Sequence, residues 1–345
     1  MKKEKQEQKP IMSEIHTYLL EDELRKKARF VKKTENGGNH IYVFSGKDCP
    51  NLMLQVGILR EISFRNSGGG TGLPFDIDRF DEFAHPDFPG TFADAGFKQL
   101  IVWDSDAHEI IGGYRYAKMS DFINDSCTAI DSPTIELFDC SSNFIRMYAP
   151  FTIELGRSFV QPKYQLRGDA VISERIICKA MYALNNLFDG LGTLTVDYKE
   201  DNIQYFFGKV TMYKTYNRQA RNMILYYMNK HFPDTHRLVM PKSNLIPLGL
   251  NKEITLLDLI FVGNTEREDK QILKKSLRDI KEGIPPLFKK YTEMSPTLKV
   301  FGTAINHHCG EVEETALMIK ISDIVEEYQK NYILKYLRKK FNKIF

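Results

Sequence analysis

The residues that could do chemistry are concentrated between Thr152 and Ala170. A run rich in β-forming residues, Thr152 to Val160, leads into a loop, and a helix is expected to open near Gly168 and Asp169. A helix that follows a strand and a small-residue turn presents its free N–H groups to a phosphate. The segment therefore predicts a phosphate-binding turn. The alternative is an ordinary helix start in which Asp169 favours the first turn.

The loop itself carries a more specific pattern, Gln165-x-x-Gly168-x-Ala170. It resembles the Q/R-x-x-G-x-G/A pyrophosphate loop of the GCN5-related N-acyltransferase (GNAT) fold. That resemblance implies an acyl donor with a 4′-phosphopantetheine thioester, acyl carrier protein or coenzyme A, acting as substrate and not as a bound cofactor. The residues that it assigns to the phosphopantetheine arm are Phe159, Val160, Gln165, Arg167, Gly168 and Ala170.

Several other blocks are similar to one family. Glu154-Leu155-Gly156-Arg157 resembles the hallmark of the ornithine-lipid and glycine-lipid N-acyltransferases, often called hemolysin-like, and the related acyl-homoserine-lactone synthases carry a similar Glu-x-x-Arg. The spacer 233–283 and the glycines of 68–72 resemble the Bacteroidetes branch, whose members make N-acyl-glycine lipids. The remaining blocks, in the family's order, are Leu59-Arg60-x-x-x-Phe64, Asp76 to Asp81, Ile111 to Arg115, Phe207 to Val210 and Ile284 to Tyr291.

The resemblance implies that a (3-hydroxy)fatty acyl group moves from acyl carrier protein to the α-amine of an amino acid, with glycine favoured, in aminolipid biosynthesis. An α-amine must lose a proton before it attacks a thioester, and Glu154 is the candidate base. The acceptor's carboxylate calls for a guanidinium that binds it bidentately, for which Arg115 and Arg157 are the candidates. Ornithine as acceptor and a lactone-synthase-like enzyme are the alternative activities.

Residues upstream match the lactone synthases, where similar Arg and Asp positions organise the active site. Arg60, Asp78 and Asp81 match those positions, and Phe64, from the same helix block as Arg60, joins them as an expected substrate-binding residue. The alternative is an ion-pair network of Arg60 and Arg115 with the two aspartates that only holds the neighbouring glycine loop in place.

Geometry sets one condition on this site. In a regular strand Glu154 and Arg157 would point to opposite faces, because they are three positions apart. A β-bulge at Gly156 would shift the parity and bring both side chains to one face. We therefore expect a bulge near Gly156; the alternative is that this glycine serves only close helix packing.

Strand-like and helix-like segments alternate along the chain, which predicts an α/β or α+β fold: a GNAT-like mixed, twisted sheet flanked by helices, with added helical segments. The expected helices are 52–65, 169–188, 218–231 and 269–281, and the expected strands are 99–103, 110–117, 152–160, 205–212, 298–304 and 315–321. We expect an N-terminal helical extension over 1–50 and an acyltransferase domain over 51–325, in which 233–283 is an insertion or subdomain.

The C-terminal segment 326–345 is expected to be a basic amphipathic helix. Such a helix indicates binding to a membrane surface, and the alternative is a helix docked on the core with its basic face in solvent. Its apolar residues at helical spacing are Ile333, Tyr336, Leu337, Phe341, Ile344 and Phe345, and its basic residues are Lys335, Arg338, Lys339, Lys340 and Lys343.

Composition limits the function classes. A net charge of +3 over 345 residues is too weak for a nucleic-acid-binding protein, and 42% hydrophobic with 12% aromatic residues excludes a largely disordered chain. The charged N-terminus leads into no apolar segment of a signal peptide, and no apolar run approaches the roughly 20 residues of a membrane span. The expected location is the cytoplasm, with peripheral contact to the inner membrane.

Two other features have weaker interpretations. The five cysteines are scattered without CxxC spacing, and His307-His308 stands where the family has an acidic residue, so no metal site is assigned. The glycine loop 68–72 is interpreted as a lid over the acceptor site or as a plain connector. A non-enzymatic alternative is a membrane-surface binding protein with a dead site, against which the retained Glu154, Arg157 and Gln165 argue.

Overall fold

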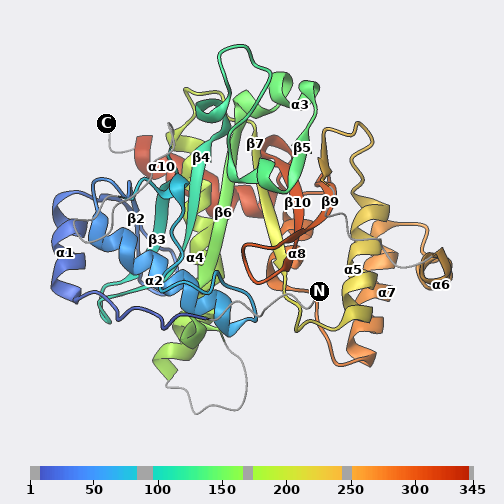
Figure 1. Cartoon of the computed structure of the whole chain (residues 1–345), viewed down its shortest axis with the longest axis horizontal. Coiled ribbons are helices and arrows are strands. Elements are labelled where there is room, and N and C mark those ends of the chain that lie inside the picture. Colours follow the sequence, from blue (N-terminus) through green and yellow to red (C-terminus); the bar gives the residue numbers. More distant parts are fainter. Residues whose placement is uncertain (1–7, 84–95, 166–173, 243–250, 342–345) are drawn as a thin grey trace. The chain divides into compact units, whose positions relative to one another are not determined.

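The computed structural model describes residues 8–83, 96–165, 174–242 and 251–341 (Figure 1). The chain divides into two compact units. The first comprises Met1–Phe122, Ile153–Ile203 and Glu326–Phe345, and the second comprises Ile123–Thr152 and Gln204–Val325.

The first unit is built on a row of antiparallel strands in the order β1-β2-β3-β4-β6. The strands β3, β4 and β6 agree with the expected ones to within one or two residues. The other two fall inside the segment expected to be a helical extension, of which only α1 (Thr17–Lys26) is helical. The strand bounds are β1 Arg29–Lys33, β2 His40–Phe44, β3 Lys98–Asp104, β4 Glu109–Lys118 and β6 Thr152–Val160.

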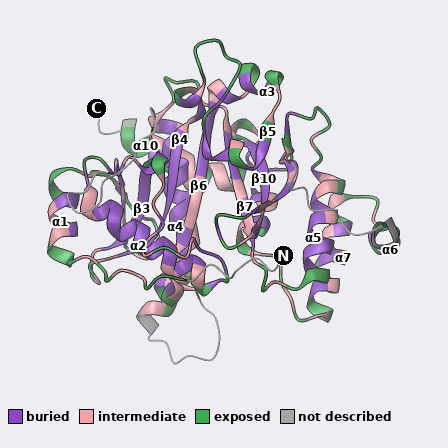
Figure 2. Ribbon diagram, viewed as in Figure 1, coloured by how far each residue is buried: buried purple, intermediate pink, exposed green. Residues whose placement is uncertain are grey.

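Two long helices cover opposite faces of these strands. The helix α2 (Pro50–Asn66) places Arg60 against Gln99 of β3. The helix α4 (Glu174–Asp197) packs on the next residue, Leu100. A Cβ added at Gly190 of α4 would lie 2.7 Å from Leu100 Cδ2. Adjacent residues of a strand point to opposite faces, so the two helices lie on opposite sides of β3. Most of α2 is buried (Figure 2), as expected for a helix that is apolar on nearly all sides.

The second unit contains three antiparallel strands in the order β7-β10-β9 and a separate two-stranded sheet, β5-β8. A parallel bridge joins Pro233 to Val300. The prolines 285–286 open α8, because Pro286 occupies its first helical position. The bounds are β5 Phe138–Cys140, α3 Ser142–Met147, β7 Tyr205–Met212, α5 Arg218–His231, β8 Val239–Pro241, α6 Asn251–Ile260, α7 Glu266–Asp279, α8 Pro286–Met294, β9 Lys299–Asn306 and β10 Val312–Lys320.

Together these elements confirm the expected α/β class, with sheets flanked by helices. The helices expected over 218–231 and 269–281 correspond to α5 and α7. The start of the helix expected from residue 169 lies in 166–173, outside the described residues, and α4 runs on to Asp197.

The C-terminal segment docks on α4. It runs as α9 (Glu326–Tyr328), a π-helical segment (Gln329–Leu334) and α10 (Lys335–Phe341). The Tyr336 hydroxyl donates to Asp197 Oδ1 over 3.0 Å, and the Tyr332 hydroxyl donates to Asn185 Oδ1 over 3.2 Å. Its basic side chains, Lys335, Arg338, Lys339 and Lys340, remain exposed. Over the described residues, this segment is therefore docked on α4, and its binding to a membrane surface stays a prediction.

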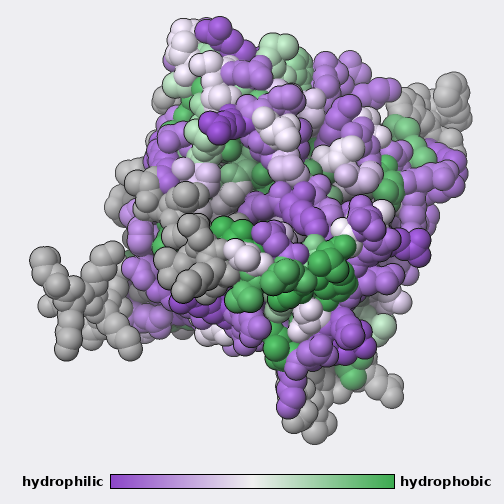
Figure 3. All heavy atoms as spheres, turned by 90° about the vertical axis from the view of Figure 1, so that its right-hand side faces the viewer, coloured by the Kyte–Doolittle hydropathy of each residue, from purple (hydrophilic) through white to green (hydrophobic). Residues whose placement is uncertain are grey.

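Exposed apolar side chains gather on one face of the second unit. Figure 3 views the molecule from the side where α5, α6 and α7 lie and shows apolar side chains gathered there. Of the helices in the described ranges, none combines the length and apolar character needed to cross a membrane. The exposed large aliphatic residues at and just after α6 include Leu256, Leu259, Ile260 and Val262.

Candidate active site

The α2-facing side of the first unit's strands brings Arg115 and Glu154 together. Arg115 of β4 lies opposite Gln99 of β3 and opposite Gly156 of β6, and Ala117 lies opposite Glu154. Residues paired across an antiparallel ladder point to the same face, as do residues two apart in one strand. Glu154, 2% exposed, and Arg115, also 2% exposed, therefore share the buried face that meets Arg60.

The expected bulge near Gly156 is confirmed. Gly113 of β4 pairs with Phe159, and Arg115 pairs with Gly156, so β6 uses one residue more than β4 between these pairs. The residue with the left-handed backbone is Arg157, at φ 48°. The left-handed conformation costs a non-glycine residue of order 1–2 kcal/mol. Glycine would therefore be more favourable at position 157 if only the bend mattered.

Gly156 has a separate role from the bend. A Cβ at this position would lie 3.3 Å from Arg115 Nε, so the glycine leaves room for the guanidinium that crosses it. The close approach is thus made by an arginine side chain and not by a helix, which replaces the alternative of close helix packing.

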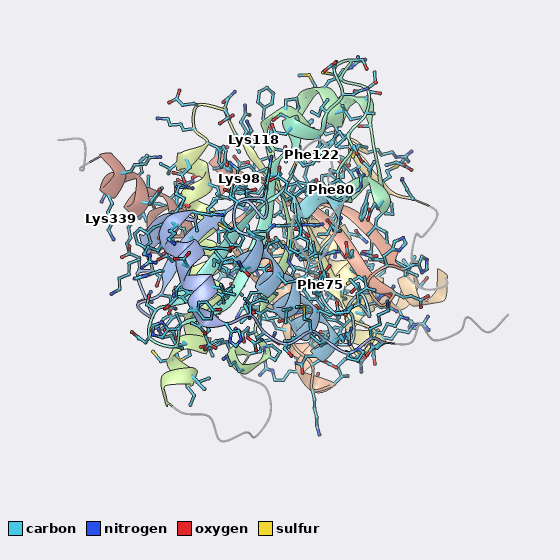
Figure 4. All side chains as sticks on the ribbon, turned by 60° about the vertical axis from the view of Figure 1, so that its left-hand side comes forward. Phe75, Phe80, Lys98, Lys118, Phe122 and Lys339 are labelled. Carbon is cyan, nitrogen blue, oxygen red and sulfur yellow. The ribbon has the colours of Figure 1, made fainter. Side chains whose placement is uncertain are left out.

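Three aspartates converge on these arginines from the segment after α2. Asp76 is tied to α2 by its N–H, which donates to Gly57 O over 2.9 Å. Asp78 caps a 3-10 turn, Arg79–Asp81, by accepting from Phe80 N over 3.0 Å, while its own N–H donates to Asp81 Oδ2 over 3.1 Å. Phe75 and Phe80, labelled in Figure 4, mark where this acidic segment lies. Local capping therefore fixes where the carboxylates point.

The aspartates and arginines form one ion-pair network. Arg60 Nη1 lies 3.0 Å from Asp81 Oδ2, and both side chains have no exposed surface. Arg115 Nη1 lies 2.7 Å from Asp78 Oδ1 and 3.2 Å from Asp81 Oδ2. Arg157 Nε lies 2.9 Å from Asp76 Oδ2, and its Nη2 lies 3.5 Å from Asp78 Oδ2. The network interpretation named Arg60 and Arg115 with Asp78 and Asp81, and the structure adds one further pair, Arg157 with Asp76.

Exposure divides this network into an inner and an outer part. Arg60, Asp81 and Arg115 are buried, and Gln99 joins them by donating to Asp81 Oδ1 over 3.1 Å. Side chains of Asp78 and Arg157 keep 31% and 20% of their surface exposed. Asp78 and Arg157 are therefore accessible from solvent, whereas the buried groups contact them from the inner side.

Burial and pairing shift the ionisation of these groups in different directions. Burial raises the pKa of Asp76, and the opposing charges of Arg157 and Arg60 do not fully offset it. Burial also opposes the ionised form of Asp78, but Arg115 and Arg157 outweigh it and hold the pKa of that carboxyl well below its usual range. Burial would lower the pKa of Arg115, yet Asp78 and Asp81 raise it. Asp78 is therefore a fixed negative charge beside two fixed positive ones.

The two expected phenylalanines lie in the core. Phe64 and Phe159 belong to one buried cluster with the apolar side of α2. The aromatic ring that meets the polar network is Phe97, whose centroid lies 5.0 Å from Arg115 Cζ. Sequence reasoning did not assign Phe97, Gln99 or Asp76 to the site. Asp76 had a signal, because it stands two residues before Asp78 in the same acidic block, whereas Gln99 is an ordinary strand residue in the sequence.

The loop after β6, which is expected to bind the acyl donor, is described only up to Gln165. Its side chain donates from Nε2 to Val160 O over 2.6 Å, so it closes the loop that leaves β6. A Cβ at Gly112 would lie 2.4 Å from Phe159 O, so a glycine is needed where β4 passes the end of β6. The remaining expected phosphopantetheine residues, Arg167, Gly168 and Ala170, lie in 166–173, outside the described residues.

Comparison with known proteins now gives the family. Residues 91–173 match the model of an acetyltransferase (GNAT) domain. A glycine N(alpha)-acyltransferase of Bacteroides thetaiotaomicron is 43% identical over 327 residues, 95% of this chain and 90% of the relative. A glycine N(alpha)-acyltransferase of Phocaeicola vulgatus is 41% identical over 329 residues, 95% of this chain and 93% of the relative. No solved structure gives a significant match.

Proposed function

The chain belongs to the family of GNAT-fold N-acyltransferases that includes these two relatives and is an amino-acid N-acyltransferase, and we propose that its acceptor is glycine and its donor a fatty acyl group on acyl carrier protein. The observation that carries the choice of glycine is the similarity to two glycine N(alpha)-acyltransferases along 95% of the chain. The choice of carrier protein rests on the segment 154–157, which resembles the hallmark of the aminolipid N-acyltransferases.

The outer part of the network suits a zwitterionic amino acid. We propose that Arg157 binds the acceptor's carboxylate, because it is the more exposed of the two candidate guanidinium groups. Asp78 then faces the acceptor's ammonium group. Arg115, which is buried and committed to Asp78 and Asp81, keeps Asp78 ionised and positioned. Both ends of glycine thus meet an opposite charge.

Glu154 is the proposed general base, acting directly or through a water. The glycine ammonium passes a proton to this carboxylate, and the free amine attacks the thioester carbonyl. The new C–N bond forms and the C–S bond breaks, and the nitrogen loses a second proton as the amide forms. Of the two protons that the ammonium group releases, one ends on the departing phosphopantetheine thiolate and the other passes to solvent. The buried face that Glu154 shares with Arg115 supports this role, because a dry setting strengthens the electrostatic interactions that orient the amine.

The product is an N-acyl amino acid, an amphiphile, so we also propose that the enzyme works at a membrane surface. The exposed aliphatic residues of α6 and the exposed lysines of α10 are compatible with such contact. Sedimentation of the purified protein with anionic liposomes tests this; protein that stays in the supernatant at low salt would contradict it.

Lipid extraction from a host that lacks such lipids tests the proposed function. Expression of the wild-type chain should add N-acylglycine species to the extract, and Glu154→Gln should add almost none. N-acylornithine as the main new species would replace glycine by ornithine, and an acyl-homoserine lactone in the medium would assign the chain to the lactone synthases. No new acylated amine with a folded protein would favour the dead-site alternative.

A further inference from the structure

A second carboxylate, Glu61, binds the glycine-rich turn 68–72. Its side chain has no exposed surface, although it lies one residue after Arg60 on α2. Oε2 accepts from both the N–H and the hydroxyl of Thr71, each over 2.9 Å, and Oε1 accepts from Gly72 N over 2.8 Å. The N–H groups of the turn thus enclose an anion that the chain itself supplies.

Arg65 extends this attachment to two further segments. Its Nε donates to Glu61 Oε1 over 2.7 Å, its Nη2 to Leu73 O over 2.6 Å and its Nη1 to Lys9 O over 2.7 Å. The N-terminal segment is also bound to the turn directly, because Lys9 N donates to Gly72 O over 2.9 Å and Met12 N to Pro74 O over 3.1 Å. The backbone from Thr71 to Pro74 is therefore held by α2 on one side and by residues 9–12 on the other.

This backbone leads straight to the acceptor site. Only three residues lie between Gly72 and Asp76, the carboxylate that pairs with Arg157. The next tie is Asp76 N on Gly57 O, one turn before Glu61 on the same helix. A Cβ at Gly57 would lie 2.6 Å from Ile77 Cγ1, so this stretch presses against α2. The point at which the turn is attached to α2 therefore sets the position of the segment that carries the aspartates.

We propose that Glu61 is a positioning residue for the acceptor site: by anchoring the turn 68–72, it sets the position of Asp76 and Asp78 and hence the affinity for the amino acid. The proposal rests on the proposed acceptor role of Asp78 and Arg157. It also gives the glycine turn a function different from both a lid and a plain connector. The turn is the attachment point of the acceptor-binding carboxylates.

The variant Glu61→Gln tests the proposal at nearly constant size. An amide has one acceptor oxygen and presents its NH2 to donors, so the contacts with Thr71 or Gly72 are lost. The KM for glycine should rise about tenfold or more, since removing a buried acceptor has effects of that order. The KM for the acyl donor should stay unchanged and kcat should fall less. A merely structural role would lower kcat through loss of folded enzyme and leave both KM values alone.

Glu23→Gln is the matched control. Glu23 is also buried, at 6% exposed, and also accepts from two backbone N–H groups of α2, those of Asn51 and Leu52. It serves the opposite end of the helix, away from the turn. Its loss should reduce stability comparably and leave the KM for glycine unchanged. Equal effects of the two variants on that KM would overturn the proposal.

A second pair disturbs the turn while keeping Glu61. An alanine methyl at Gly70 would lie 2.9 Å from Arg65 Cγ and 3.1 Å from Glu61 Oε1, whereas one at Gly72 meets nothing within 4 Å. Both glycines have positive φ, so the backbone strain is shared. Gly70→Ala should raise the KM for glycine like Glu61→Gln, and Gly72→Ala should raise it less. If Glu61→Gln does not fold, the comparison of Gly70→Ala with Gly72→Ala still tests the positioning role.

Amide hydrogen exchange gives a readout that needs no activity. In Glu61→Gln, the amides of Asp76 to Asp81 should exchange about tenfold faster or more than in the wild type, and in Glu23→Gln they should not. A wild-type enzyme inactive on glycine would refute the proposed function but leave this comparison intact. If amide exchange over Asp76 to Asp81 were unchanged in both Glu61→Gln and Gly70→Ala, the positioning role would be refuted, whichever amino acid is the acceptor.

Discussion

At the scale of single residues, replacement of Glu154 is the sharpest test of the proposed general base. Glu154→Gln removes the proton acceptor and keeps the size of a side chain that is 2% exposed. Turnover should fall about 10²–10⁴-fold, the usual contribution of general base catalysis. Steady-state rates at saturating glycine and donor measure this. A fall of less than tenfold, in protein with unchanged thermal unfolding, would mean that another group takes the proton.

The two arginines should separate binding from stability. Arg157→Lys keeps the charge at the outer edge but loses the planar fork, so the KM for glycine should rise about tenfold or more, with little change in unfolding free energy. Arg115→Ala leaves Asp81 buried without one of its partners and should destabilise the fold by about 3–5 kcal/mol. Urea unfolding and glycine titration distinguish them. A stable Arg115→Ala with weak glycine binding would make Arg115 the carboxylate clamp.

Asp78 predicts how stability depends on pH. Its pKa is lower in the folded chain than the unfolded value of about 3.9, so the ionised form stabilises the fold above that value. This stabilisation is lost as the pH falls through the unfolded value toward the folded one. Between pH 5 and pH 2.5 the unfolding free energy should therefore decrease more in the wild type than in Asp78→Asn. Parallel pH profiles for the two proteins would show that Asp78 is not held ionised by its arginines.

At the scale of elements, the bulged pair of β4 and β6 depends on its glycines to different degrees. Gly112→Ala would bring a methyl to 2.4 Å from a backbone oxygen, Phe159 O, which cannot move without separating the strands. Gly156→Ala would meet Arg115 Nε at 3.3 Å, the end of a side chain. We expect a loss of about 1–3 kcal/mol for the first and less for the second. Denaturant unfolding ranks them, and the reverse order would contradict this account of the bulge.

Sequence reasoning was accurate where one element carries its own periodic signal. The apolar segment at 50–66, α5 and the strands β3, β4 and β7 are as expected. It missed β1, a short edge strand with the sequence RFVKK, whose charged residues protect an exposed edge and mask the strand pattern. It also missed β2, although the sequence HIYVF is rich in β-forming residues. The bulge was foreseen from the spacing of Glu154 and Arg157. Its φ, however, belongs to Arg157, which no pattern marks, and Gln99 enters the site only because β3 pairs with β4.

At the scale of the whole molecule, the C-terminal segment should contribute stability. Truncation after Tyr332 removes Tyr336, which is 8% exposed and bonded to Asp197, and should lower the unfolding free energy by about 2–4 kcal/mol. As a control, Lys339→Ala removes an exposed ion pair with Glu35 and should change stability by less than about 1 kcal/mol. Thermal unfolding of both proteins checks this. A truncated chain as stable as the full one would show that the segment does not dock in solution.

The central claim is that this amino-acid N-acyltransferase acylates glycine, and one competition measurement tests it most directly. Purified wild-type enzyme receives fatty acyl carrier protein with equimolar glycine and ornithine, and mass spectrometry quantifies both N-acyl products. The account predicts N-acylglycine in large excess, because the similar proteins are glycine N(alpha)-acyltransferases. Arg157 and Asp78 match the α-carboxylate and α-ammonium groups that both amino acids carry, so the choice between them rests on that similarity. N-acylornithine in equal or greater amount would contradict it.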